Sequence, residues 1–439
     1  MRRGAFACLQ KNEIMKKFLT SAGLIAIGAS GIHAASPVEL SPIEASKPWS
    51  VSAALRGFYD DNYTTSSSDL KRSSLGYQLT PSASLNLPLD QTFIGVSYEY
   101  SFLYFEDRRN NKYDQNHKFD GRLDHKFSER YKVEVNDSFV VAQEPEVLSP
   151  GGGAISSPLR TQGDNMRNLG TIKFSAQATE LLAVELGYAN TFFNYEQDKN
   201  SNDVEPGQAS RSGLLDRIEH AISLDLRWRA LPDTDGILGY QFGVVDFTGN
   251  EALNPGAPDE IFSEERNSHS HRVYVGADHR FNAQLAGSAR IGGQYTDYYN
   301  QNNTDVSPYI DANLTYEYGV GNFIKAGLSH TLARTDVFSV QTLNDITVDQ
   351  QVTAVYASVS HKITSKLIGS LLVQGQRGEF QGGTEDGNVE YYFLPGINFA
   401  YNFNPHLSAE AGYNFDRLDS ESGRSYSRNR VYLGVRATY

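Results

Sequence analysis

The sequence predicts an all-β protein, a transmembrane antiparallel up-and-down β-barrel of about 18 strands, with 16 as the alternative count. Three observations support this fold class. Apolar and polar residues alternate along nearly the whole chain, short turn sequences alternate with longer polar segments, and aromatic residues, 12% of the chain, gather near the predicted strand ends. A barrel with a lipid-facing outside and a polar inside needs a side-chain period of two and aromatic belts at both interfaces.

The N-terminus has the composition of an export signal. Lys16 and Lys17 precede an apolar stretch over residues 18–29, and Ala34 or Ala35 offers a cleavage point after small residues. A charged start, a short apolar region and small residues before the cut define a secretory signal. The apolar stretch is too short to span a bilayer as a helix.

The signal divides the chain into three predicted parts. Met15 begins a signal of ordinary length, so the true start of the protein is either Met1 or Met15. We expect a signal peptide over residues 1–35, a short periplasmic lead-in over residues 36–48, and an outer-membrane barrel over residues 49–439.

Charge and cysteine content exclude several classes of function. The only cysteine, Cys8, lies in the predicted signal, so the mature chain has no disulfide, no thiolate nucleophile and no cysteine-based metal site. The chain has 39 Lys/Arg and 52 Asp/Glu, of which five bases and one acid precede residue 36, leaving a net charge of about −17. Such an acidic chain argues against a nucleic-acid partner. A mean hydropathy of −0.45 excludes a helical membrane protein, whereas a barrel needs apolar residues on one face only.

Strands follow from the alternation, and turns follow from where it is interrupted. The segments 74–87, 116–127, 389–403 and 428–439 each alternate apolar with polar residues, and the last ends on the aromatic Tyr439. Short turns are predicted at 87–90, 127–130, 179–181, 231–236, 281–284, 319–322, 363–366 and 403–406, with the longest polar segments near 144–166, 197–216 and 249–267. Eight short turns and nine longer loops join 18 strands, and this even number places both termini in the periplasm.

Two soluble alternatives fit the alternation but not the other features. A soluble all-β protein, or two β-sandwiches, would also alternate, with the polar face toward water. A pair of sandwiches needs a linker that the sequence lacks, and neither alternative explains the clusters of aromatic residues at strand ends.

The sequence contains no convincing catalytic or metal-binding pattern, so we expect no enzyme activity, no cofactor and no metal. The chain has no Gly-x-Ser-x-Gly motif, no His-Glu-x-x-His motif and no phosphate-binding loop motif. His269 and His271 share a spacing that can hold a metal but is more typical of one strand face. The segment 233–236 begins like a calcium loop but lacks the downstream carboxylate, so a tight turn is expected.

The inward-facing residues carry the chemistry of the predicted barrel. Bases and acids are nearly balanced on this face, so most of the negative charge is expected in the loops. A lumen with so many charges must be wet, because unpaired charge in a dry interior is prohibitive, although salt bridges that close the lumen are the alternative. The predicted pore-lining residues are Arg56, Glu99, Lys118, Asp120, Arg122, Asp124, Lys126, Glu134, Lys173, Arg227, Arg229, Arg272, Arg290, Glu390, Arg428, Arg430 and Arg436.

The signal peptide, the cysteine-free mature chain, the strand-and-turn rhythm and the terminal Tyr439 resemble Gram-negative outer-membrane β-barrel porins. Within this class the chain resembles the putative β-barrel porin-2-like family over residues 49–439. The resemblance implies location in the cell outer membrane, contact with outer-membrane lipids and lipopolysaccharide, and recognition of the Tyr439 strand by the barrel-assembly machinery. No functional residue of the family can be transferred to a position in this chain.

General porins fold one loop into the pore, and the corresponding segment here joins predicted strands five and six. It is rich in glycine and proline and carries both charge signs. It either lines a constriction or forms a mobile external loop. The candidate constriction residues are Glu144, Glu146, Arg160, Asp164 and Arg167.

We therefore expect an outer-membrane channel for passive diffusion of small hydrophilic solutes. A substrate-specific channel or polysaccharide exporter would share the fold but carry an ordered ladder of like charges or aromatics. A closed structural or adhesive barrel would use its acidic loops, and a barrel enzyme would need a catalytic group that the sequence lacks. A homo-oligomer is compatible with all of these readings.

Overall fold

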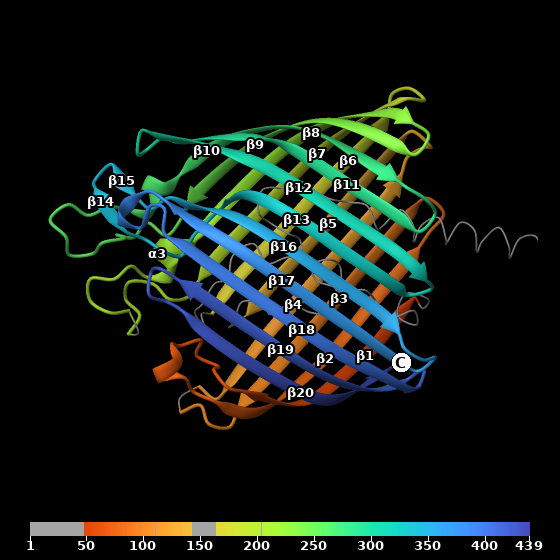
Figure 1. Cartoon of the computed structure of the whole chain (residues 1–439), viewed down its shortest axis with the longest axis horizontal. Helices are drawn as coiled ribbons and strands as arrows, with labels where there is room; N and C mark the ends of the chain where they lie inside the picture. The colour runs from red at the N-terminus through yellow and green to blue at the C-terminus, as the bar shows by residue number, and fades with distance from the viewer. Residues whose placement is uncertain (1–47, 110, 143–163, 203) are drawn as a thin grey trace, which may run out of the picture.

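The protein forms one closed β-barrel. The computed structural model describes residues 48–109, 111–142, 164–202 and 204–439. Among them, 18 strands form a single antiparallel sheet (Figure 1). The sheet closes on itself because the first strand, β1 (Trp49–Asp60), pairs with both β2 (Ser74–Pro88) and the last strand, β20 (Tyr426–Thr438). The predicted fold class and strand number are confirmed.

Each strand pairs with its neighbours in the sequence. The remaining barrel strands are β3 (Thr92–Phe105), β4 (Tyr113–Lys126), β5 (Tyr131–Ala142), β6 (Asn165–Gln177), β7 (Leu182–Tyr195), β8 (Arg217–Leu231), β9 (Thr234–Phe247), β10 (Ser268–Arg280), β11 (Leu285–Tyr298), β12 (Asn303–Gly319), β13 (Asn322–Ala333), β16 (Asp349–Lys362), β17 (Leu367–Gln381), β18 (Val389–Asn404) and β19 (Leu407–Ser420).

Short turns and long loops lie at opposite ends of the barrel. Eight short turns, at 89–91, 127–130, 178–181, 232–233, 281–284, 320–321, 363–366 and 405–406, lie within or beside the predicted turn segments. The C-terminus lies at this end, opposite α3, β14 and β15 (Figure 1). One loop at the other end, 299–302, is as short as a turn, because Gln301 donates its N–H to Tyr298 and Asn302 adopts a positive φ of 51°.

The long-loop end carries most of the structure outside the barrel strands. It contains the short helix α3 (Arg211–Leu215), the two-stranded hairpin of β14 (Val340–Thr342) and β15 (Asp345–Ile346), and single 3-10 turns. The 3-10 turns are η1 (Ser68–Leu70), η2 (Ser263–Arg266) and η3 (Gly383–Glu385). Within the described ranges, no helix is long and apolar enough to cross a bilayer.

Exposure alternates along the strands as the sequence pattern predicts. In β20, Val431, Leu433 and Val435 are exposed, whereas Arg428 is buried. The exposed set is apolar and forms the outer face, so its exposure to lipid costs nothing, while the polar set faces the interior. The two faces of the barrel wall therefore differ in chemistry along its length.

The predicted N-terminal parts lie almost entirely outside the described residues. The signal peptide over residues 1–35 and the lead-in up to residue 47 are not described, so both stay predictions. Pro48 is described, and its carbonyl accepts a hydrogen bond from the Asn86 N–H at 2.8 Å. The chain therefore enters the barrel at the short-turn end of β2.

Candidate functional site

Side chains that meet across an intervening strand identify the inner face of the wall. Arg56 of β1 donates to Glu410 of β19 at 2.7 Å, passing over β20. The Tyr432 hydroxyl of β20 donates to Asn398 of β18 at 2.5 Å, passing over β19. Side chains converge in this way only on the concave side of a curved sheet. The faces of all other residues follow from these by alternation.

Gly239 shows how closely inner side chains pack over a middle strand. Tyr274 of β10 crosses β9 at Gly239 and donates its hydroxyl to Asp225 of β8 at 2.5 Å. A Cβ atom on Gly239 would lie 2.2 Å from the Tyr274 ring. Glycine is required at this position because the Tyr274 ring lies directly against the backbone.

A first charged arc runs along the inner face from β4 to β11. Some of its ion pairs lie within one strand and others join different strands, and each acid has one or two basic partners. The pairs are Arg122–Asp124 at 2.7 Å, Lys132–Glu134, Lys173–Glu134 at 3.4 Å, Lys173–Glu185 and Arg227–Glu185 at 3.7 Å, Arg227–Asp278, Arg290–Asp278 at 3.3 Å and Arg229–Asp235 at 2.7 Å.

A second charged arc lies at the closing seam, on β19, β20 and β1. Glu410 pairs with Arg56 and with Arg436, each at 2.7 Å. Further toward the loop end, Arg430 pairs with Asp416 at 3.1 Å and Arg428 with Asp60 at 2.5 Å; these four residues complete the arc. The seam is therefore joined by ion pairs as well as by the backbone ladder.

In most inner-wall pairs the acid lies deeper than the base. The Arg122 side chain is 29% exposed but that of Asp124 only 8%, and the Arg436 side chain is 30% exposed but that of Glu410 only 13%. Long basic side chains extend their charged ends toward water, whereas short carboxylates stay near the backbone. The surface of the lumen thus presents guanidinium and ammonium groups more than carboxylates.

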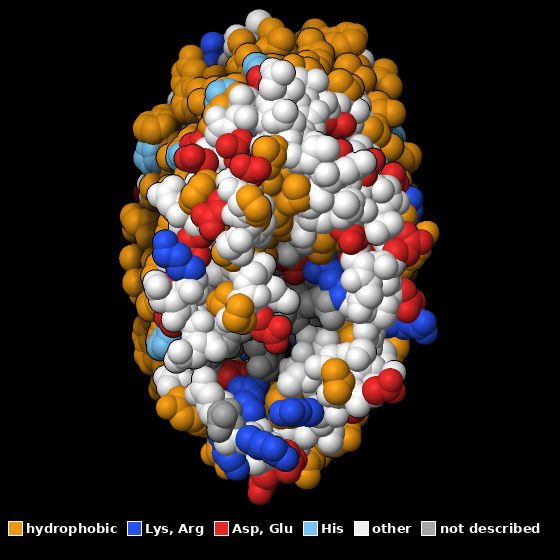
Figure 2. Space-filling view, turned by 90° about the vertical axis from the view of Figure 1, so that its left-hand side faces the viewer, with side chains coloured by type: hydrophobic (Ala, Val, Ile, Leu, Met, Phe, Trp, Pro, Cys, Tyr) orange, Lys and Arg blue, Asp and Glu red, His pale blue; other side chains and the backbone are white. Residues whose placement is uncertain are grey.

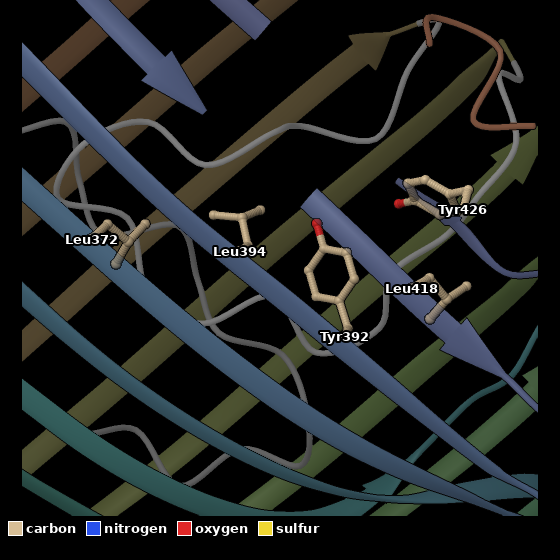
Figure 3. Close-up of a cluster of buried hydrophobic side chains, with 5 residues drawn as sticks. All are labelled: Leu372, Tyr392, Leu394, Leu418 and Tyr426. Carbon is tan, nitrogen blue, oxygen red and sulfur yellow. The ribbon is translucent and has the colours of Figure 1, made fainter. Parts of the chain in front are cut away.

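The inner face of β16–β18 differs from both arcs because its middle part carries no charge. Gln374 and Gln376 of β17 are buried there. Beside them lies an apolar cluster of Leu372, Tyr392, Leu394, Leu418 and Tyr426, contributed by β17 to β20 (Figure 3). The lining of the lumen therefore includes two charged arcs and one uncharged arc.

One buried arginine joins three of the external loops. Arg266 donates to the carbonyl of Leu214 at 3.0 Å, to that of Thr335 at 2.8 Å and to that of Val348 at 3.1 Å. Its guanidinium also lies 4.7 Å from the centre of the Phe247 ring. Burial lowers the pKa of Arg266 to about 10, so it remains charged at neutral pH.

Further ion pairs fix the same end of the barrel. Arg424 pairs with Glu390 at 2.5 Å and with Asp336 at 2.7 Å. Burial alone would lower the pKa of Arg424, but the two carboxylates outweigh it, so the pKa is raised. Arg334 pairs with Asp349, which also accepts from Tyr298 at 2.5 Å. These contacts hold the loop over residues 334–348 against the barrel rim.

Among the loop carboxyls that the structure describes, Asp216, at the end of α3, is the one with a strongly raised pKa. Burial raises its pKa to about 6, and the nearby Glu251 carboxylate adds to this effect. Ser212 donates to Asp216 at 2.7 Å and the Tyr195 N–H donates at 2.7 Å, which partly offsets the increase. Asp216 therefore takes up a proton in mildly acidic solution.

The loop end is partly open. Figure 2 shows the face that carries α3 and the long loops, with a hollow in its lower half. Lys, Arg, Asp and Glu side chains border this hollow, whereas the upper half of the face is filled. Among the described residues, the hollow therefore lies off-centre on this face.

The predicted pore-lining residues all fall on the inner face by alternation, but their exposure differs widely. Arg229 is about half exposed. Several others are buried against the side chains that they pair with, namely Asp124, Glu134, Arg272, Arg290, Glu390 and Arg428. Arg272 donates to Gln241 at 2.9 Å and to Gln294, and lies over the Tyr309 ring at 4.3 Å. Such buried residues shape the wall rather than its wet surface.

The candidate constriction residues are only partly described. Glu144, Glu146 and Arg160 lie outside the described residues. Asp164 accepts a backbone hydrogen bond from Glu196 at 2.9 Å. Arg167 lies in β6 itself, opposite Val140 and Phe193, so it belongs to the wall and not to the loop.

Sequence reasoning missed the buried arginines near the loop end. Arg108 pairs with Asp114 at 2.5 Å, and Arg266, Arg334 and Arg424 make the contacts described above. Loops have no side-chain period, so no pattern in the sequence distinguishes a buried loop arginine from an exposed one.

The structure shows where the two weak metal patterns of the sequence lie. His269 and His271 lie on the outer face of β10, against Phe242 and Tyr299. The segment 233–236 spans the turn between β8 and β9 and the start of β9. Across the described parts of the chain, no three His, Cys, Asp or Glu side chains are grouped so that they could hold a metal.

Comparison with known proteins identifies one family. The model of the family described as Putative beta-barrel porin 2 matches residues 50–439. No curated protein matches the chain. Among solved structures, OccK11 (OpdR) of Pseudomonas aeruginosa has 14% identity and a TM-score of 0.43, covering 89% of this chain and 96% of that one. OccAB4 of Acinetobacter baumannii has 10% identity and a TM-score of 0.41, covering 90% of this chain and 99% of that one.

Proposed function

This chain belongs to the β-barrel porin family described as Putative beta-barrel porin 2, and from that membership we propose a passive channel with a weak preference for anionic solutes. The chain is an outer-membrane porin channel, in contact with membrane lipids. The proposal adds the sign of its selectivity. Passive transport requires no bond chemistry, because the narrowest ring sets the size limit and the wall charges set the selectivity.

The relative depth of acids and bases in the inner-wall pairs carries this proposal. At long range each ion pair is nearly neutral, so the wall attracts neither sign strongly. Within a Debye length, about 8 Å at physiological ionic strength, a solute meets the nearer charge first. Where that charge is Arg122 or Arg436, an anion is favoured.

The acidic loops limit the preference. The loop before β10 contains Glu251, Asp259, Glu260, Glu264 and Glu265 against one buried base, Arg266. A negative rim repels anions at the entrance, while the wall favours them inside. We therefore expect a permeability ratio of chloride to potassium modestly above one.

Replacing inner-wall bases by glutamine tests the proposal. R122Q combined with R436Q should lower the chloride-to-potassium permeability ratio, as measured from the reversal potential in a potassium chloride gradient. The lumen then exposes Asp124 and Glu410 with fewer covering cations.

The matched control is R377Q combined with R417Q. Like Arg122, each of these arginines pairs with an acid two residues away, Glu379 at 2.7 Å and Asp419 at 2.9 Å, but both lie on the outer face. Their replacement should leave the permeability ratio unchanged. An equal shift in both double variants, or no shift in the inner one, would contradict the proposed role of the lumen bases.

We also infer that residues 1–35 are removed on export and that Tyr439 presents the last strand to the barrel-assembly machinery. In support, Tyr439 completes the seam, exchanging backbone hydrogen bonds with Val51 at 2.8 and 3.1 Å, and its ring lies 5.6 Å from that of Trp49. N-terminal sequencing of the membrane form tests the first inference. Deletion of Tyr439 tests the second, with a lower yield of inserted barrel expected. Homo-oligomer formation stays a prediction.

A further inference from the structure

One carboxylate lies on the outer face of the barrel wall, in the middle of its strand. Asp137 is the seventh of the twelve residues of β5. It shares its face of the strand with the exposed Tyr131, whereas Glu134 is buried on the inner face. Asp137 is itself exposed. The proposed channel does not use this carboxylate, because the channel lies on the other side of the wall.

The position of Asp137 along β5 places it within the hydrocarbon layer. Tyr131 begins β5 at the short-turn end, and its ring stacks on that of Phe174 at 6.2 Å, as in an aromatic belt. Strands rise about 3.3 Å per residue and tilt by about 40°, so the chain from Tyr131 to Asp137 climbs roughly 15 Å. The apolar band of such barrels is about 25 Å tall. Asp137 therefore lies near the middle of the bilayer.

The other outward carboxylates of the described strands lie at a different height. Each is within two residues of the loop end of its strand, where headgroups and water are close. These carboxylates belong to Asp246, Asp297, Glu379 and Asp419. A carboxyl in the middle of a lipid-facing strand is costly, so an ionisable residue at this depth indicates a function that needs it.

Asp137 is only partly satisfied within its own copy of the chain. Asn168 of β6 donates from Nδ2 to both carboxylate oxygens at 3.1 Å. The two cross-strand neighbours of Asp137 are Gly121 and Gly170, so no cation faces it across a strand. One amide cannot saturate a carboxylate, which accepts about four hydrogen bonds. Lipid tails have no donors, so a further donor must come from another protein surface.

The surface around Asp137 is low and is bordered by apolar side chains. A Cβ atom on Gly170 would lie 3.2 Å from Asp137 Oδ1, and the space around Gly121 is open. Two residues along these strands lie Phe119 and Ile172, each 46% exposed. Small residues let the backbones of two membrane-spanning segments approach closely. The β5 patch, as we name it, consists of Asp137, Asn168, Gly121 and Gly170.

A second copy of this chain is the partner that fits the β5 patch. Every copy inserts in the same direction and to the same depth, so each copy presents the Asn168 donor and the Asp137 acceptor at matching heights. A closed two-fold contact brings the same surface of both copies together, and each residue pair then occurs twice. The patch is self-complementary in this sense, because it carries both a donor and an acceptor.

We propose that the mature barrel forms a two-fold dimer through the β5 patch. Each Asn168 amide donates to the Asp137 carboxyl of the second copy as well as to its own, and the two amides separate the two carboxyls. Gly121 and Gly170 let the walls approach, while Phe119 and Ile172 pack around the polar centre. This inference goes beyond the channel function, since the pore of each copy is unchanged.

Single-molecule photobleaching of the mature barrel in lipid vesicles tests this proposal. The only cysteine precedes the barrel, so K199C in an exposed loop takes one dye per copy. At a low ratio of protein to lipid, the otherwise unchanged barrel should bleach mostly in two steps. D137L/N168L should raise the dissociation constant of the dimer about tenfold to a hundredfold and still fold, because leucine suits the lipid face. D137N keeps the shape and the hydrogen bonds, so it should stay dimeric.

The matched control is H330L/T353L. His330 Nδ1 and Thr353 Oγ1 also form an outward polar pair, at 2.7 Å, but on β13 and β16 at the opposite side of the barrel. This control should dimerise like the unchanged barrel. A monomeric unchanged barrel, a monomeric D137N, an unchanged dissociation constant in D137L/N168L or an equal loss in the control would overturn the proposal. Single-channel conductance should be the same in all these proteins, so a failure here is distinct from a failure of the proposed selectivity.

Discussion

Arg428 and Asp60 form a buried ion pair between the last and the first strand of the barrel. The Arg428 guanidinium donates from Nε at 2.9 Å and from Nη2 at 2.5 Å to the same carboxylate. Both side chains are buried, and Asp60 also accepts from the Asn62 N–H at 3.0 Å. The pair lies at the loop end of the seam, where the backbone ladder between the two strands ends.

Removal of one partner of this pair should destabilise the closed barrel. R428L leaves the Asp60 carboxylate buried without its cation, and such a loss costs about 3–5 kcal/mol. Urea unfolding in lipid vesicles, followed by the shift in gel migration of the unheated protein, measures the change. As a control, R417L breaks an exposed pair on the outer face and should leave the free energy of unfolding nearly unchanged. Similar effects of both variants would show that the seam does not depend on Arg428.

Charge on the outer face should be far less tolerated than charge on the inner face. L123R and V435R place a cation in the hydrocarbon region and should each cost about 2–4 kcal/mol if the site is near the midplane. S360R, on the inner face of β16, should cost much less because its side chain enters water. Unfolding in lipid vesicles compares the three variants. Equal losses would mean that the two faces are assigned wrongly.

The loop end should loosen when Arg266 is replaced. R266M removes the donors to three buried carbonyl groups. Each carbonyl that stays without a partner should lower the free energy of unfolding by about 1–3 kcal/mol. We expect faster amide exchange in loops 196–216 and 334–348 and more current noise in single channels. K199M, at an exposed position in the first of these loops, is the control. Unchanged exchange in R266M would show that the three loops are held independently of Arg266.

The stability of α3 should fall as the pH rises from about 4 to 7. The pKa of Asp216 is about 6 in the folded protein, above its ordinary value of 3.8. The folded loop therefore binds the proton more tightly than the unfolded loop, and this stabilisation is lost as the carboxyl ionises on the way to neutral pH. Amide exchange of residues 211–215, corrected for its intrinsic pH dependence, measures the effect. D216N should flatten the profile, and a profile that rises toward neutral pH would contradict the assignment.

The sequence was sufficient to predict the strands and turns because both depend on local patterns. Alternation in segments such as 428–439 is set by the period of two, and each short turn interrupts it at a defined place. The pairing of charges depends on register and curvature instead. Arg56 reaches Glu410 across β20, and no sequence period relates residues 354 positions apart.

The packing of the loops could not be predicted from the sequence, for a second reason. Arg266 is bound by residues of two other loops, and its carbonyl partners are backbone atoms that any residue could supply. The relative depth of Arg122 and Asp124 also follows from the packed wall, since alternation assigns both simply to the inner face. Alternation can assign a residue to a face of the wall, whereas the exposure of each side chain depends on how the wall packs.

The reversal potential of single wild-type channels in planar bilayers tests the account most directly. Across a potassium chloride gradient, we predict an open channel with ohmic current and a reversal potential displaced modestly toward the chloride equilibrium potential. A barrel that carries no current would contradict the channel itself. A displacement toward the potassium equilibrium potential would contradict the claim that the bases of the inner wall control which ions pass.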